Sequence, residues 1–171
     1  NFMHGIPHFA CTVALERDSE LVAGVTYNPV TNDLYWAEKG KGAYHNDRRL
    51  RVSSRKNLDE GLIGTGLPFI GKPGHAQALK ELHQIMQRTV GIRRNGAASL
   101  DLCYVAAGQF DAFWERNLKP WDMAAGLLMV HEAGGKFSSI DDDRSPILSG
   151  DVICGNQDMH GQLLDKLRLA K

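Results

Sequence analysis

Short apolar runs separated by turn residues fill the first third of the chain. The intervening turns are rich in Asn, Asp, Pro and Gly, and a further tight turn at 46–48 leads into 50–52. Short runs with such boundaries are typical of antiparallel strands joined by hairpins. The pattern therefore predicts a meander whose strands lie near residues 8–15, 21–27, 34–37 and 43–44.

The rest of the chain alternates between strand-like and helical patterns. Leu79, Leu82 and Ile85 recur at helical spacing, which predicts a helix over about 73–88. The same reasoning predicts helices over 97–107, from Pro120 to the glycines at 134–135, and around 163–167, with strands at 62–65, 111–115, 136–140 and 152–155. Strands followed by this alternation predict layered α/β packing within one domain, residues 1–171.

Charge and cysteine content narrow the class of protein. Lys+Arg and Asp+Glu number 20 each, so the net charge is zero, which argues against a general nucleic-acid or acidic-membrane surface. No apolar run reaches membrane-spanning length. Cys11, Cys103 and Cys154 are odd in number and far apart, so we expect unpaired thiols and a reducing, cytoplasmic environment.

Two carboxylates near Pro120 are candidates for chemistry. Asp122 falls in the first turn of a predicted helix, where it can cap free backbone N–H groups or, alternatively, bind Mg²⁺. Glu115 ends a predicted strand seven residues upstream and has the alternative of a solvated strand-end carboxylate. The short loop 116–120 between them can bring both acids to one cleft.

A group of small residues opens the helix predicted over 97–107. Gly96, Ala97 and Ala98 would let a ligand approach the positively polarised backbone amides, although tight helix packing explains the same residues. The Gly-Lys-Gly at 40–42 lacks the spacing of a phosphate loop, and no serine stands in a GxSxG setting. We therefore set aside P-loop and serine-hydrolase chemistry.

Four segments in the same order resemble motifs of the inositol monophosphatase family, in its bacterial branch. The opening NFMHGIP is similar to the end of the family's DP-[IL]-DGT-TNF-xHGxP loop. The other three segments are YWAEKGKGA at 35–43, GIRRNGAASLD at 91–101, and FWE through KPWDMAAG at 113–126, followed by EAGG at 132–135.

The resemblance implies a layered αβαβα sugar-phosphatase fold and a lithium-sensitive homodimer. It implies Mg²⁺-dependent hydrolysis of inositol monophosphate, or of a related small polyol phosphate, by metal-activated water. Asp122 would then be the catalytic metal ligand and would also contact the substrate. Glu115 would contact a substrate hydroxyl, and Gly96, Ala97 and Ala98 would line the substrate pocket.

The sequence departs from the family pattern at its start. The remaining metal ligands of the family lie in GEE and DP-[IL]-DGT motifs, which would precede Asn1. We therefore expect that an N-terminal portion is missing, that these residues alone are inactive, and that apolar side chains are exposed beside Asn1. Three alternatives stay open: a related phosphatase acting on fructose bisphosphate, histidinol phosphate or a nucleotide-derived phosphate; a non-catalytic regulatory binding protein; and a metal-poor structural fragment.

Overall fold

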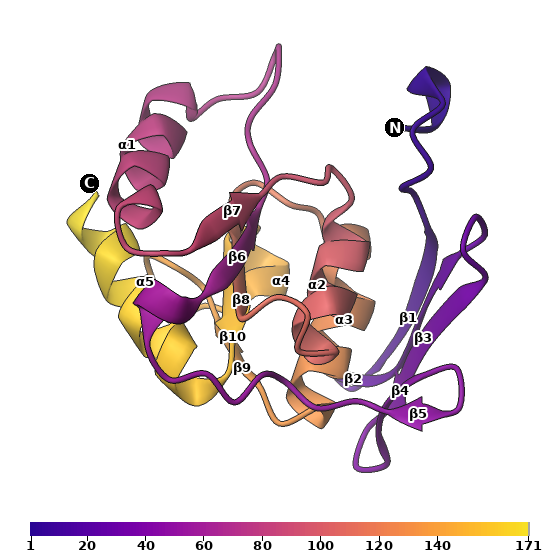
Figure 1. The fold of residues 1–171 in the computed structure, drawn as a ribbon. Coiled ribbons are helices and arrows are strands. Elements are labelled where there is room, and N and C mark those ends of the chain that lie inside the picture. The colour runs from indigo at the N-terminus through magenta and orange to yellow at the C-terminus, as the bar shows by residue number, and fades with distance from the viewer. Residues whose placement is uncertain (171) are drawn as a thin grey trace.

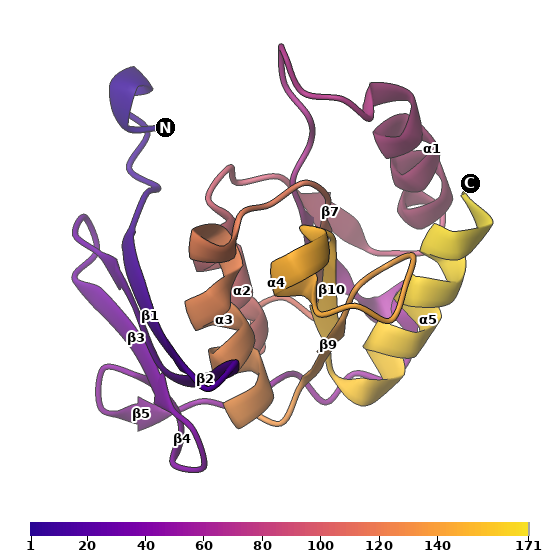
Figure 2. The same cartoon turned by 180° about the vertical axis from the view of Figure 1, so that it is seen from behind.

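The computed structural model describes residues 1–170 as stacked layers of sheets and helices, and Lys171 of the predicted domain lies outside them. Two five-stranded sheets enclose α2 (Ala98–Ala106) and α3 (Pro120–Glu132) (Figure 1). The helices α1 (His75–Met86) and α5 (Gln157–Leu169) lie against the far side of the second sheet. The view from behind shows the same order of sheet, helices, sheet and helices (Figure 2). The predicted layered α/β fold is confirmed.

The first sheet is the predicted antiparallel meander. Its strands follow chain order from β1 to β5, and every neighbouring pair is antiparallel. The first strand begins three residues later than predicted, because its ladder starts where Cys11 pairs with Tyr27 and the partner strand ends at Asn28. The strands are β1 (Cys11–Arg17), β2 (Glu20–Asn28), β3 (Asp33–Glu38), β4 (Gly42–His45) and β5 (Arg48–Arg49).

The second sheet is mixed and has the order β7-β6-β8-β10-β9. Strand β6 runs parallel to both β7 and β8, whereas β10 runs antiparallel to β8 and β9. The parallel pair β6 and β8 brings two strand ends to the same edge of the sheet. The strands are β6 (Leu62–Thr65), β7 (Gly91–Arg93), β8 (Ala112–Glu115), β9 (Lys136–Ser138) and β10 (Val152–Gly155).

Helix α3 lies between the two sheets and is buried on all sides. Each residue from 123 to 130 is buried, which fits a helix that is apolar around its whole circumference. Small residues allow its close contacts: a Cβ on Gly126 would lie 2.4 Å from Leu102 Cβ of α2, and a Cβ on Gly24 would lie 2.8 Å from Ala125 Cα. Helices α2 and α3 and the first sheet therefore pack in direct contact with one another.

The far end of α3 is bound to the hairpin between β3 and β4. The carboxylate of Glu132 accepts the backbone N–H of Gly40 at 2.7 Å through one oxygen and that of Gly42 at 2.9 Å through the other. Both glycines have positive φ, 76° and 98°, which a side chain would strain. This carboxylate therefore fixes the end of the helix to a tight turn in the first sheet.

Three short helices were not predicted: η1 (Phe2–His4), η2 (Leu58–Glu60) and α4 (Pro146–Ser149).

Beside the N-terminus, Phe2, Met3 and Ile6 are 72%, 94% and 47% exposed, so the expected exposed apolar side chains are present. The cause proposed for that exposure, a missing segment, stays a prediction.

The three cysteines are unpaired, as predicted. Among residues 1–170, each helix is too short or too polar to cross a bilayer.

Candidate active site

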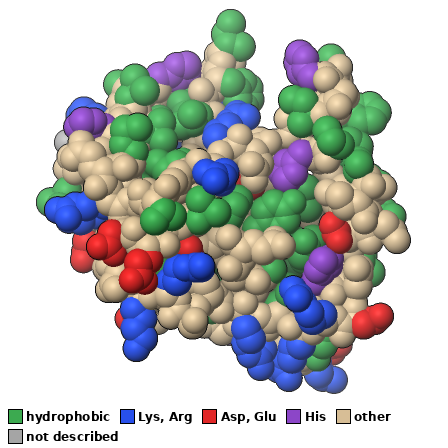
Figure 3. Space-filling view, viewed as in Figure 1, with side chains coloured by type: hydrophobic (Ala, Val, Ile, Leu, Met, Phe, Trp, Pro, Cys, Tyr) green, Lys and Arg blue, Asp and Glu red, His purple; other side chains and the backbone are tan. Residues whose placement is uncertain are grey.

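The ends of β6 and β8 and the starts of α2 and α3 border one cavity of about 680 Å³. The cavity opens as a notch between the loop that follows β6 and the N-terminal segment (Figure 3). The carboxyl ends of parallel strands are the usual location of ligand sites in open α/β sheets. Helix N-termini facing such a cavity add free backbone N–H groups and a positive dipole end.

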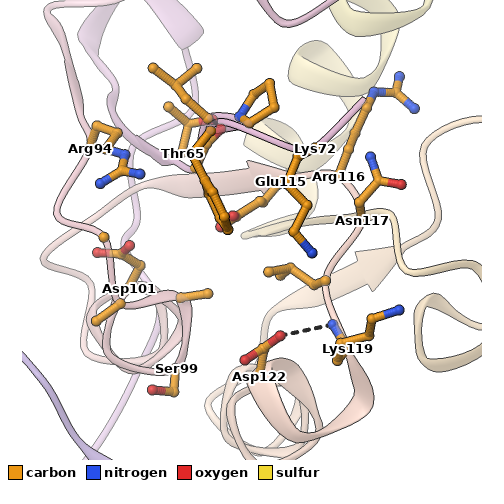
Figure 4. A pocket seen from close by; sticks show the side chains of 18 of the residues that line it. Thr65, Lys72, Arg94, Ser99, Asp101, Glu115, Arg116, Asn117, Lys119 and Asp122 are labelled. Carbon is orange, nitrogen blue, oxygen red and sulfur yellow. Dashed lines mark hydrogen bonds between the residues drawn. The ribbon is translucent and has the colours of Figure 1, made fainter. Parts of the chain in front are cut away.

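Asp122 lies in the first turn of α3 and lines this cavity. One of its oxygens, Oδ2, accepts the backbone N–H of Lys119 at 2.9 Å (Figure 4), and its own N–H donates to the Lys119 carbonyl at 2.9 Å. The other oxygen accepts no hydrogen bond from residues 1–170. The helix-capping alternative is therefore present, and it leaves one oxygen available to a ligand.

Glu115 is the last residue of β8, and its carboxyl group lies over the backbone of Gly66, just beyond β6. A Cβ at Gly66 would come within 1.9 Å of the Glu115 Cδ. Only glycine at position 66 leaves room for this carboxyl group, so the end of β6 helps to set the direction of the Glu115 side chain.

A third carboxyl group, that of Asp101 in α2, also borders the cavity. Burial is the main cause that raises the pKa of Asp101 to about 7, and a hydrogen bond from Asn95 at 3.0 Å partly opposes it. Burial, followed by the charge of Asp101, raises the pKa of Glu115 to about 7, with a smaller contribution from Asp122. The negative charges of Asp101 and Asp122 thus disfavour the ionisation of Glu115.

Such a set of carboxylate oxygens fits a hard divalent cation, which would compensate their charge. Among residues 1–170, however, no three His, Cys, Asp or Glu side chains are gathered closely enough to hold a metal ion together. Asp101, Glu115 and Asp122 would therefore supply at most part of a ligand set, and Asp122 would contribute the oxygen that does not bind the Lys119 N–H.

The start of α2, in contrast to the carboxylates, offers hydrogen-bond donors to the cavity. Its N-cap residue, Ala97, has no side chain that could accept a hydrogen bond, and its carbonyl accepts the N–H groups of Leu100 and Asp101 at 2.9 and 3.0 Å. The preceding amides, those of Ala98 and Ser99, have no acceptor among residues 1–170. These N–H groups are free to bind an anion in the cavity.

The N-terminal segment is bound to the loop before α2. The Asn1 side-chain amide donates to the carbonyl of His8 at 2.7 Å and to that of Asn95 at 2.9 Å. Gly96 follows with φ 82°, in the left-handed region that favours glycine, and the helix begins two residues later. The α2 start is thereby positioned by residues distant in the sequence.

The residues predicted from sequence, Gly96, Ala97, Ala98, Glu115 and Asp122, all line this one cavity. Sequence reasoning missed Asp101 and Gly66, as well as two cations that line the same cavity, Lys72 and Arg94. Asp101 stood within the segment that resembled the family, which was the available signal. Gly66, directly after a strand, carried no signal of its own.

Comparisons with known proteins agree with this geometry. The model of the inositol monophosphatase family matches residues 1–170. A relative from Caulobacter vibrioides, inositol-1-monophosphatase, is 60% identical over 173 residues, which cover 99% of this chain and 68% of the relative. A relative from Pseudomonas aeruginosa, Nus factor SuhB, is 44% identical over 170 residues, covering 98% of this chain and 63% of the relative.

A solved protein structure also resembles this chain closely in fold and sequence. The crystal structure of the extragenic suppressor protein suhB from Bartonella henselae has a TM-score of 0.95 and 49% identity, and the match covers 98% of this chain and 65% of that one. The chain thus spans about two thirds of the length of these relatives. The match along residues 1–170 and the identity to these relatives establish that this chain belongs to the inositol monophosphatase family.

Proposed function

We propose that the protein containing this chain is a Mg²⁺-dependent phosphomonoesterase that hydrolyses inositol monophosphate or a related small polyol phosphate. One observation carries the proposal: the free amides at the start of α2 and the free oxygen of Asp122 at the start of α3 face the same cavity. An anion-binding group beside a cation-binding group is the arrangement that a metal-bound phosphate ester requires.

Each side chain then has a definite task. Asp122 holds Mg²⁺ through the oxygen that does not cap α3. When bound, Mg²⁺ supplies Lewis-acid chemistry: it lowers the pKa of a water molecule and neutralises charge on the phosphate. The amides of Ala98 and Ser99 bind the phosphate oxygens, and the small side chains of Gly96, Ala97 and Ala98 let the ester approach. Glu115 accepts a hydrogen bond from a hydroxyl of the polyol.

The direct test is phosphate release by the full-length protein from inositol 1-phosphate, with Mg²⁺ and with excess chelator. We expect turnover with Mg²⁺ and none with chelator. Undiminished turnover in chelator would contradict the metal mechanism. Parallel assays with fructose bisphosphate, histidinol phosphate and a nucleotide-derived phosphate distinguish the substrate alternatives.

The resemblance further suggests a homodimer whose subunits each have one domain, to which residues 1–171 contribute. Light scattering of the full-length protein at micromolar concentration tests this oligomeric state.

A regulatory role is the second candidate, because the 44% identical relative from Pseudomonas aeruginosa carries the name Nus factor SuhB. Chromosomal replacement by the Asp122→Asn variant separates the two roles. A cell with this variant that behaves like the wild type, and unlike the deletion, would favour a role that does not need catalysis. A cell that behaves like the deletion would favour the phosphatase.

A further inference from the structure

The side chain of Arg116 connects three parts of the fold beside the cavity. Its guanidinium donates to Oε1 of Glu81 in α1 at 2.7 Å, to Oδ2 of Asp141 at 2.6 Å and to Oδ2 of Asp151 at 2.9 Å. The Arg116 side chain is only 17% exposed, and that of Glu81 is 2% exposed. The Asp141 and Asp151 side chains are 38% and 22% exposed, so the group is buried at Glu81 and opens to solvent at Asp141. Hydrogen-bonded ion pairs that share one guanidinium restrict its orientation.

Glu81 gives this group of ion pairs a fixed anchor. Its second oxygen accepts the indole N–H of Trp114 in β8 at 3.2 Å, and its first also accepts the Gln77 side chain at 3.0 Å. Both carboxylate oxygens are therefore bonded, and one of the donors precedes Glu115 in the same strand. The anchor thus joins α1 to the end of β8 at the point where the chain leaves the sheet.

The other end of the group holds the loop between β8 and α3. Asp151 pairs with Arg116 through Oδ2 and accepts the backbone N–H of Asn117 through Oδ1 at 3.1 Å. Asn117 has φ 62°, the left-handed conformation that asparagine adopts more readily than most residues, so the chain turns sharply here. The next N–H, that of Leu118, donates to the carbonyl of Gly150 at 2.8 Å.

We propose that Arg116 is a positioning residue, which fixes residues 116–119 and thereby sets the directions of the Glu115 and Asp122 carboxylates. Glu115 immediately precedes this loop, and the loop ends at Lys119, whose N–H binds the capping oxygen of Asp122 at 2.9 Å. A shift of the loop therefore moves both carboxylates. The inference rests on the proposed function, which assigns the two carboxylates to metal and substrate.

The direction of the Arg116 side chain supports positioning rather than contact with the substrate. Its guanidinium points away from Asp122 (Figure 4) and is occupied by three carboxylates. Two other cations at the cavity, Lys72 and Lys119, form no ion pair among residues 1–170 and remain free for anions. Arg116 therefore acts through the loop.

The test compares Arg116→Met and Arg116→Lys with wild type in the full-length protein. Phosphate release gives kcat and KM, and calorimetry gives the Mg²⁺ dissociation constant. We expect Arg116→Met to lower kcat or weaken Mg²⁺ binding by about 10–100-fold, the usual effect of removing a group that orients a metal ligand. KM should change by less than about 3-fold, since substrate contacts remain. Arg116→Lys should recover part of the loss because it keeps the charge.

Two controls separate positioning from general destabilisation. Arg144→Met removes an arginine whose one ion pair within residues 1–170 joins it to Asp142 on an exposed segment, and which interacts more weakly with Asp151 by charge alone, so kcat should stay unchanged. Ile85→Val loosens the buried contacts of α1 without touching the ion pairs, so it should lower Tm while leaving kcat and Mg²⁺ affinity unchanged. A kcat loss in Ile85→Val as large as in Arg116→Met would overturn the inference.

Asp151→Ala keeps the test decisive if Arg116→Met does not fold. This partly exposed residue binds both Arg116 and the loop amide of Asn117, so its removal should lower kcat by about 10-fold. Wild-type kcat and Mg²⁺ affinity in Asp151→Ala or in a folded Arg116→Met would overturn the inference. A wild-type protein inactive on every phosphate ester would instead refute the proposed function, and Mg²⁺ calorimetry of the variants would still decide the positioning role.

Discussion

Helices α2 and α3 run side by side and begin at the same cavity, yet their N-terminal backbone amides are satisfied differently (Figure 1). The first turn of α2 opens with small residues and leaves the amides of Ala98 and Ser99 free, and burial raises the pKa of its one acid, Asp101, to about 7. The first turn of α3 carries its own carboxylate, Asp122, which binds the Lys119 N–H. The positive end of one dipole is thus left open to an anion, whereas that of the other is already compensated and presents a negative oxygen.

The largest effect is expected when the α3 start loses its charge. Asp122→Asn keeps the shape of the side chain but removes a charged metal ligand, so kcat should fall by about 1,000-fold or more. The matched control is Asp158→Asn, which removes an acid from the first turn of α5, away from the cavity. Steady-state phosphate release measures both variants. Wild-type kcat in Asp122→Asn would refute the assignment of Asp122.

The next effect concerns the carboxylate that faces both helix starts. Glu115→Gln should reduce the discrimination between inositol phosphate and a simple aryl phosphate by about 1–3 kcal/mol, because a hydroxyl of the polyol loses its charged acceptor. The ratio of kcat/KM for the two substrates is the measurement. Equal losses on both substrates would indicate instead that Glu115 acts on the metal or the fold.

Making the α2 start resemble that of α3 gives a smaller effect. Ala97→Asp introduces an N-cap carboxylate that accepts the free amides and repels phosphate, so KM should rise by about 10-fold. The same change should stabilise the helix by about 1 kcal/mol. Ala97→Asn is the neutral control of equal size. A KM that rises equally in both variants would show that bulk, rather than charge, is responsible.

A separate effect concerns the free energy of unfolding rather than activity, and it depends on pH. Asp101 has a folded pKa of about 7 against an ordinary value of 3.8, so the folded state holds an extra proton between these values. Stability must therefore fall as pH rises through this window, by up to about 1.4 kcal/mol per pH unit from this group. Asp101→Asn removes the titration, and its stability advantage over wild type should grow from pH 5 to pH 7.

Urea unfolding at both pH values, in excess chelator, measures this difference. The matched control is Asp165→Asn, the same substitution on the exposed side of α5. An advantage of Asp101→Asn that is constant or shrinks toward pH 7 would contradict the raised pKa of Asp101.

The sequence allowed good prediction where an element was long enough to repeat its pattern. Strands β6 and β10 have the predicted bounds, and α1 and α3 lie close to theirs. Two short strands were missed: β5 has two arginines, Arg48–Arg49, and β7 has three residues, Gly91–Arg93, so no apolar run marked either of them. The missed helix α4 has four residues, which is about one turn and too short for periodicity.

The part of the candidate site that could be predicted from sequence also depends on recognisable helices and strands. Asp122 and Glu115 were found because each stood at the end of a recognisable element. Asp101 was not assigned a role, because α2 is buried on most of its surface and its periodicity does not distinguish the side that meets the cavity. The partners of Arg116 lie 25 to 35 residues from it along the chain, so only the folded structure reveals the ion pairs.

The Glu132 carboxylate has a practical consequence for anyone who wishes to label or extend this protein. It ties the β3–β4 hairpin to one end of α3, and the other end of α3 carries Asp122. A peptide tag inserted at residues 40–42 would strain a helix whose other end lines the cavity. The tip of the β1–β2 hairpin, at Asp18 and Ser19, is exposed and forms no hydrogen bond to α3 among residues 1–170, so it is the better insertion point.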